Sequence, residues 1–143
     1  MPTPAYDPTN VFARILAGSL PAHKVHEDAD TFAFMDIMPR APGHVLVIPK
    51  TPARNLLDAT PASLAACMAS VQKLSRAVMA AFAADGVTVQ QFNESAGGQV
   101  VFHLHFHVLP RHAGVALGRH TGQMEKPEVL AANAARIVRA LAG

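Results

Sequence analysis

Residues 101–109 read Val-Phe-His-Leu-His-Phe-His-Val-Leu, so a histidine recurs at every second position between bulky apolar residues. Because successive side chains of a β-strand point to opposite faces, this pattern predicts a strand over 100–109 with one histidine face. The imidazoles on that face belong to His103, His105 and His107. The apolar residues from Phe102 to Val108 would form the core face. Sheet propensity does not favour a row of histidines, so the pattern indicates a site of chemistry.

Metal binding is one interpretation of the histidine row. The Cα atoms of His103 and His107 would lie about 13 Å apart in an extended strand, whereas a zinc–nitrogen bond is only about 2 Å long. One ion could therefore not readily take all three imidazoles. Two of them could still ligate zinc with His44 as a third ligand, so a metal-dependent hydrolase stays open as a third hypothesis.

A single working imidazole fits the sequence better. A neutral histidine can attack phosphorus with one ring nitrogen when an acceptor holds its other N–H. The middle histidine, His105, has neighbours that can fix its tautomer, donate to phosphate oxygens or protonate a leaving group. Just upstream, Gly97 and Gly98 would let the backbone approach an anion, and Gln99 adds a neutral donor.

Length and composition limit the class of protein. The 143 residues predict a single domain over 1–143, and with half of them apolar and 15% charged the chain is not disordered. A net charge of +2 is too slight to predict nucleic-acid or membrane binding. No signal peptide or membrane span is evident, which favours a cytoplasmic protein. The single cysteine, Cys67, excludes an intrachain disulfide.

The order of the predicted elements indicates an α+β domain. Strands joined by short links predict an antiparallel sheet. The residues 110–126 show no clear periodicity, and a loop of this length is usually functional or disordered. We expect helices over 11–17, 61–84 and 127–141, a hairpin of 23–27 with 31–36, and strands over 44–48, 87–93 and 100–109.

Taken together, the motifs resemble those of the histidine triad (HIT) superfamily. The resemblance covers most of the chain: the triad itself at 103–109, the segment Phe32–Lys50 with Pro42-Gly43-His44, and Asn93 with Gly97-Gly98-Gln99. It implies a homodimer whose antiparallel half-barrel sheet carries one long helix and one or two shorter ones. It also implies hydrolysis or transfer at the α-phosphate of nucleoside monophosphate conjugates, such as dinucleoside polyphosphates or phosphoramidates.

The resemblance also implies roles for individual residues. His105 would be the nucleophile that forms a covalent nucleotidyl-histidine. The residues that would orient it and bind phosphate are His44, His103 and His107. Phe34 and Ile37 would line the pocket for a purine base, and Asp36 would hold the ribose. The contacts to ribose or phosphate would come from Asn93, Gly98 and Gln99.

This sequence departs from the family pattern in two features, one near the phosphate loop and one at the positions of a structural zinc site. Many members carry Ser or Thr where this chain has Val100, which puts efficient phosphoramidate cleavage in question. Bacterial relatives often bind structural zinc through two cysteines and a histidine, but the matching positions are Asn10, Ala13 and Pro52. We therefore predict no structural zinc, no metal and no required cofactor. The alternative function is a nucleotide-binding sensor or scaffold with little turnover.

Overall fold

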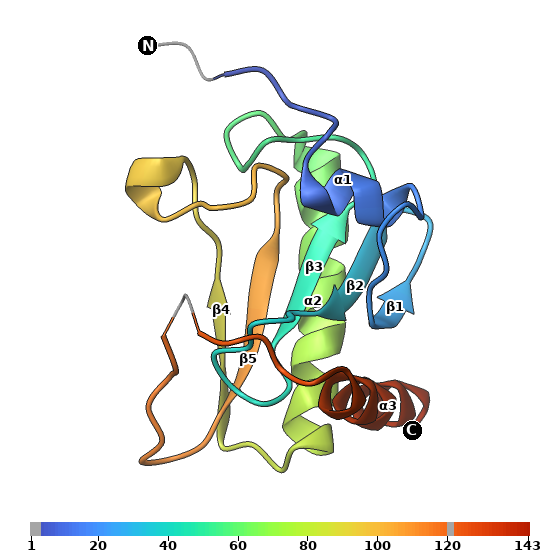
Figure 1. The fold of residues 1–143 in the computed structure, drawn as a ribbon. Coiled ribbons are helices and arrows are strands. Elements are labelled where there is room, and N and C mark those ends of the chain that lie inside the picture. The colour runs from blue at the N-terminus through green and yellow to red at the C-terminus, as the bar shows by residue number, and fades with distance from the viewer. Residues whose placement is uncertain (1–3, 120–121) are drawn as a thin grey trace.

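The computed structural model describes residues 4–119 and 122–143. The elements in chain order are α1 (Val11–Leu16), β1 (Lys24–Glu27), β2 (Thr31–Met35), β3 (Val45–Pro49), α2 (Pro61–Ala81), β4 (Gly86–Gln90), the short 3-10 helix η1 (Ser95–Gly97), β5 (Phe106–Arg111) and α3 (Pro127–Ala142). The five strands form one antiparallel sheet in the order β1-β2-β3-β5-β4 (Figure 1). The predicted α+β class is confirmed. Within the described ranges, none of the helices is long and apolar enough to cross a membrane.

The helices begin where the sequence provides caps. The side chain of Asn10 accepts a hydrogen bond from the Ala13 amide at the start of α1. Thr60 caps α2 in the same way, and Pro61 occupies its first turn. The α2 helix ends at Ala81, before the predicted end at residue 84, because the backbone turns into a positive φ at Ala83.

The central strands are buried on both faces. Alternate residues of β2 and β3 enter two separate cores, as a period of two requires. The larger core lies between the sheet and the helices α2 and α3, and contains Ala33, Met35, Val45 and Val47. The smaller core lies under α1 and contains Phe12, Phe34, Leu46 and Ile48. In Figure 1, α1 and α2 lie on opposite sides of the sheet.

The histidine segment enters the sheet later than predicted. The strand β5 begins at Phe106, so the prediction of a regular strand from residue 100 is wrong. The physical reason lies at the end of β3, where the Pro49 carbonyl accepts a hydrogen bond from the His103 ring, with Nε2 at 2.9 Å. The Leu104 amide, which would face Pro49 if the register of β3 and β5 continued, donates instead to the Ala53 carbonyl at 2.8 Å.

The predicted separation of the two faces still holds after this change. The residues that enter the larger core are Leu104, Phe106 and Val108. The imidazoles lie on the α1 side, where the Phe12 ring centroid is 5.0 Å from that of His105 and 6.5 Å from that of His103. The exception is Phe102, which was predicted to join the core. It is only half-buried and lies 4.1 Å beneath the Arg54 guanidinium.

Asp28 joins the β1–β2 hairpin to α2. One carboxylate oxygen accepts from the backbone amides of Asp30 and Thr31, and the other accepts from the Ser70 hydroxyl at 3.2 Å. Partial burial raises the pKa of this carboxyl, but these hydrogen bonds outweigh the effect and lower the pKa from 3.8 to about 2. The ionised carboxylate is therefore the form that the fold stabilises.

We expect Asp28→Asn to lower the free energy of unfolding by about 1 kcal/mol at neutral pH, a value reduced for a side chain that is 45% exposed. Because the folded pKa lies below the unfolded one, the contribution is complete above about pH 4 and is lost as the pH falls through about 2. Denaturant titrations over this interval measure it. The difference between wild type and variant should shrink towards low pH, and a constant difference would contradict the assignment.

Candidate active site

The loop before β3 places His44 against the histidine segment. Gly43 has a φ of +88°, and a Cβ atom there would lie 2.5 Å from the Phe82 ring, so only glycine fits. His44 comes directly before β3, whose residue Leu46 is paired with His107 of β5. Both imidazoles are buried, with His44 only 1% exposed. The turn therefore places a fourth histidine, His44, beside His107 of the triad.

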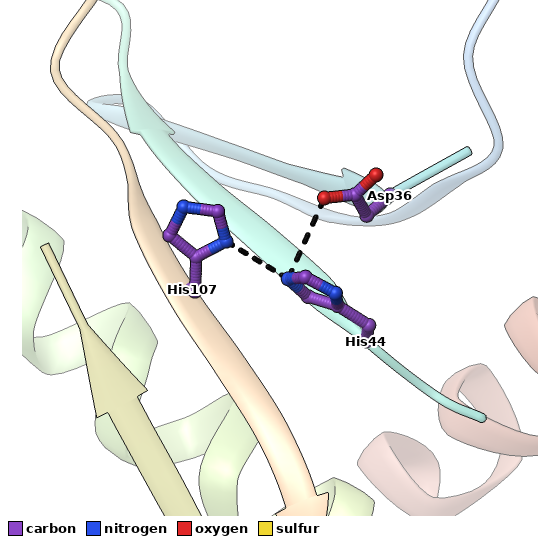
Figure 2. Close-up of side chains that lie close together, drawn as sticks. All are labelled: Asp36, His44 and His107. Carbon is purple, nitrogen blue, oxygen red and sulfur yellow. Dashed lines mark hydrogen bonds and ion pairs between the residues drawn. The ribbon is translucent and has the colours of Figure 1, made fainter. Parts of the chain in front are cut away.

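A chain of hydrogen bonds fixes the protons on these two rings. The Arg40 amide donates to Nδ1 of His44 at 3.1 Å, so the His44 proton must lie on Nε2 in the neutral ring. That N–H donates to Nδ1 of His107 at 2.8 Å, and Asp36 Oδ2 lies 3.5 Å from the same nitrogen (Figure 2). Because Nδ1 of neutral His107 accepts, the proton of His107 lies on its Nε2.

His105 is held in the opposite tautomer. Its Nδ1 lies 2.7 Å from the backbone oxygen of His103, and a carbonyl can only accept, so Nδ1 carries the proton. The lone pair of the neutral ring is then on Nε2. The His105 and His107 ring centroids are 5.0 Å apart, and both residues line one large cavity. A nucleophilic nitrogen and a donor N–H therefore belong to adjacent rings.

His103 is placed differently from the other two histidines of the triad. It is fully buried and does not line the cavity, and its two ring nitrogens are bound to Tyr6 and to the Pro49 carbonyl. Burial lowers the pKa of His103, and the hydrogen bond to Pro49 offsets only part of this effect. The structure therefore does not bring this imidazole to the cavity beside His105 and His107.

The cavity has a volume of about 680 Å³ and a mostly apolar wall. Volumes of this size are typical of sites for small organic ligands. Four of the predicted substrate-binding residues line it: Phe34, Asp36, Ile37 and Gly98. Gly98 has a φ of +99°, and a Cβ atom there would crowd the Phe92 ring at 3.2 Å. A glycine is thus required at this part of the wall.

The other two predicted substrate-binding residues hold the neighbouring loop and are not among the residues that line the cavity. Gln99 is buried, accepts from Asn55 and from the Glu94 amide, and donates to two backbone carbonyls. Asn93 exchanges amide hydrogen bonds with Gln91. Both side chains therefore build the segment before the triad, and a direct contact of either with substrate stays a prediction.

Several cavity residues were not found from the sequence. Phe12 and Ile15 of α1 form one wall, and their spacing of three along a helix was a signal for a shared face. The segment 110–126, predicted to be a functional or disordered loop, also contributes to the wall through Met124 and Glu125. The Glu125 amide donates to the Ile37 carbonyl at 2.8 Å, a contact between distant segments that no local pattern predicts. Residues 120 and 121 of that loop lie outside the described residues.

A metal ion would not suit the cluster of Asp36, His44 and His107 as it stands. One ligand atom each of Asp36, His44 and His107 lies within 4.8 Å of the others. For Nε2 of His44 to bind a metal, its proton would have to move to Nδ1, where it would face the Arg40 N–H. The observed hydrogen bonds from Arg40 to His44 and from His44 to His107 therefore favour a hydrogen-bonded network over a bound metal ion at this position.

The positions that match the family's structural zinc ligands do not fit that ion either. Asn10 uses its side-chain oxygen to cap α1, and Ala13 and Pro52 have no ligating side-chain atom. The residues present therefore do not provide the zinc site of the bacterial relatives. That the protein needs no metal stays a prediction.

Comparison with known proteins defines the class. The family model described as the HIT domain matches residues 17–114. The chain is 40% identical over 114 residues to an uncharacterized HIT-like protein of Mycobacterium tuberculosis, covering 80% of this chain and 79% of the relative. The chain belongs to the HIT family.

A solved structure and a relative with a named activity extend this comparison. The crystal structure of a Hit-like protein from Bartonella henselae, described as involved in cell-cycle regulation and with an unknown ligand, superposes with a TM-score of 0.90 at 50% identity. The match covers 95% of this chain and 99% of that one, which confirms the predicted HIT-like fold. The adenylylsulfatase HINT3 of Arabidopsis thaliana is 34% identical, covering 81% of this chain and 62% of that protein.

Proposed function

We propose that this protein is a nucleotide hydrolase or transferase that acts at the α-phosphate of nucleoside monophosphate conjugates. The observation that carries the proposal is the tautomer of His105, whose Nδ1–H is held by the His103 carbonyl in a ring that lines the cavity. This arrangement makes Nε2 the attacking atom. Membership of the HIT family is consistent with this class of reaction.

The reaction proceeds in two displacements. Nε2 of His105 attacks the α-phosphorus, a nitrogen–phosphorus bond forms, and the bond to the leaving group breaks. The Nε2–H of His107 donates to a phosphate oxygen or to the departing atom, with His44 supporting its tautomer. Water, or another acceptor in a transfer, then attacks phosphorus and releases His105. Splitting the step in this way replaces one difficult displacement by two easier ones.

The cavity walls suit a purine nucleoside. Phe34 and Phe12 meet edge to face at 5.3 Å between ring centroids, and with Ile37 they offer apolar contact to a base. Asp36 also lines the cavity, where its carboxylate can accept hydrogen bonds from ribose hydroxyls, and the Met38 amide holds one of its oxygens in place. We propose these three predicted residues, Phe34, Asp36 and Ile37, as the nucleoside contacts, and Gly98 as part of the phosphate wall.

The residues of the site indicate the nucleoside and the α-phosphate more closely than they indicate the leaving group. Dinucleoside polyphosphates, phosphoramidates and adenylyl sulfate, the substrate named for the Arabidopsis relative, all present the same α-phosphate. Val100 lines the cavity and is 67% exposed, so an apolar side chain occupies the position where many family members have a hydroxyl.

We expect Val100→Ser to raise kcat for an adenosine phosphoramidate about tenfold, because a hydroxyl can donate one hydrogen bond to the leaving nitrogen. Steady-state rates for adenosine and guanosine conjugates measure this. Val100→Ala is the matched control, since it shortens the side chain without adding a donor. An equal increase of kcat in both variants would mean that the smaller side chain causes the effect, and this would contradict a role for the hydroxyl.

The test of the function is turnover of a panel of adenosine and guanosine conjugates by protein freed of metal with a strong chelator. Release of nucleoside monophosphate at an undiminished rate supports the proposal. Loss of all activity that returns with added metal would favour the metal-dependent hydrolase. Nucleotide binding by calorimetry with no product from any conjugate would favour the sensor or scaffold.

We further propose that the protein is a homodimer, as the family resemblance implies, and that it acts on nucleotides in the cytoplasm without nucleic-acid or membrane partners. The strand β4 lies at the end of the sheet, where its outer edge has no neighbouring strand within the described chain. Val89 on this strand is 43% exposed, so the edge offers both backbone groups and apolar surface to a second copy. Light scattering on a sizing column should give twice the mass of the chain, and a monomer would contradict the proposal.

A further inference from the structure

A tyrosine before the first helix contacts the one triad histidine that lies outside the cavity. The Tyr6 hydroxyl is 2.7 Å from Nδ1 of His103, and the two rings meet edge to face with centroids 5.6 Å apart. The other ring nitrogen of His103, Nε2, lies 2.9 Å from the Pro49 carbonyl oxygen. Both polar atoms of a fully buried ring are therefore satisfied, one by a backbone carbonyl and the other by the side chain of Tyr6.

The direction of these hydrogen bonds follows from their partners. A carbonyl oxygen only accepts, so Nε2 of His103 must carry a proton. In the neutral ring Nδ1 then has only a lone pair, and the Tyr6 O–H donates to it. Burial raises the pKa of Tyr6 and lowers the pKa of His103, which keeps the hydroxyl protonated and the imidazole neutral.

The backbone of His103 contacts the proposed nucleophile, His105, directly. The backbone oxygen of His103 accepts the Nδ1–H of His105 at 2.7 Å. The Phe12 ring also contacts both imidazoles edge to face. If the His103 ring lost its hydrogen bond to the Pro49 carbonyl, the peptide group of His103 could rotate. The backbone oxygen of His103, which sets the tautomer of His105, would then move as well.

We propose that Tyr6 is a positioning residue that holds His103 as its Nε2–H tautomer, so that the His103 carbonyl orients His105 for attack. The effect on turnover rests on the proposed function. The tautomer of His103 does not depend on the proposed function, because it is a property of the protein without substrate. The two parts can therefore fail separately.

The test compares wild type with Tyr6→Phe, which keeps the ring and removes only the hydroxyl. Long-range ¹H–¹⁵N spectra report the tautomer of each histidine, and wild-type His103 should show a protonated Nε2 and an unprotonated Nδ1. In the variant the buried Nδ1 loses its donor, so the His103 and His105 ring signals should change. With a conjugate that wild type hydrolyses, kcat should fall about tenfold while KM stays within about twofold.

Ser70→Ala is the matched control, because it also removes a buried hydroxyl, here one that bonds to Thr31 at 2.7 Å between β2 and α2. It should lower stability and leave kcat and the His103 signals unchanged. Equal losses of kcat in both variants, or unchanged ring signals in Tyr6→Phe, would overturn the proposal.

If Tyr6→Phe does not fold, the wild-type spectrum decides alone, since a His103 ring protonated on Nδ1 would also overturn the proposal. If no conjugate is turned over, the proposed function fails and the spectra still decide the role of Tyr6.

Discussion

Replacing His105 with alanine should lower turnover of the best nucleotide conjugate on the order of 10⁴-fold or more while leaving the fold intact. The variant loses the atom that forms the covalent bond, and neither neighbouring ring can replace it. His103 is fully engaged outside the cavity, and the Nδ1 of His107 accepts from His44. Single-turnover and steady-state rates on metal-free protein measure the loss.

The matched control for His105→Ala is His112→Ala. His112 also uses a ring nitrogen to bond to a backbone carbonyl, that of Phe82 at 3.0 Å, but it does not line the large cavity. Its variant should keep turnover near the wild-type rate, and both variants should show cooperative thermal unfolding. Wild-type activity of His105→Ala on every conjugate tried would remove the covalent mechanism.

The second large effect concerns stability. Gly43→Ala should lower the free energy of unfolding by about 3 kcal/mol. The substitution combines a backbone φ of +88° with a Cβ atom that would lie 2.5 Å from the Phe82 ring. The neighbouring His44 should also shift, so turnover should fall along with stability. Denaturant unfolding gives the first quantity and steady-state rates give the second.

Gly18→Ala separates the two causes of that effect. Gly18 has a similar φ of +80°, but a Cβ atom there would meet nothing within 4 Å. Its variant should lose only about 1 kcal/mol, the cost of the backbone conformation alone. If the two alanine variants lost equal stability, close packing against Phe82 would not be the reason for glycine at position 43.

The fold could be predicted from the sequence wherever a local signal sets the structure. Asn10 and Thr60 are residue types that cap helices and precede the two helices predicted from residues 11 and 61, and the apolar run over 44–48 predicted the strand that became β3. The start of the histidine strand could not be predicted in this way. It depends on the His103 ring occupying the Pro49 carbonyl, a contact between residues 54 positions apart in the chain.

The same distinction applies to the site. The sequence predicted a shared site for His44, His105 and His107, and the structure places His44 2.8 Å from His107 and the His105 and His107 ring centroids 5.0 Å apart. The sequence could not distinguish His103 from its neighbours. The alternation places the three imidazoles on the same face but does not show which of them reach the cavity. It also did not indicate Tyr6, whose contact with the triad spans 97 positions.

The most direct test of the central claim is the mass of the intact protein after rapid mixing with nucleotide conjugates. Chelated wild-type protein and the His105→Ala variant are mixed with each adenosine and guanosine conjugate and quenched at successive times. The covalent mechanism predicts a transient gain of one nucleoside monophosphate on wild type and none on the variant. Product formed without any adduct at the shortest times, or an equal adduct on His105→Ala, would contradict a nucleotidyl-His105 intermediate.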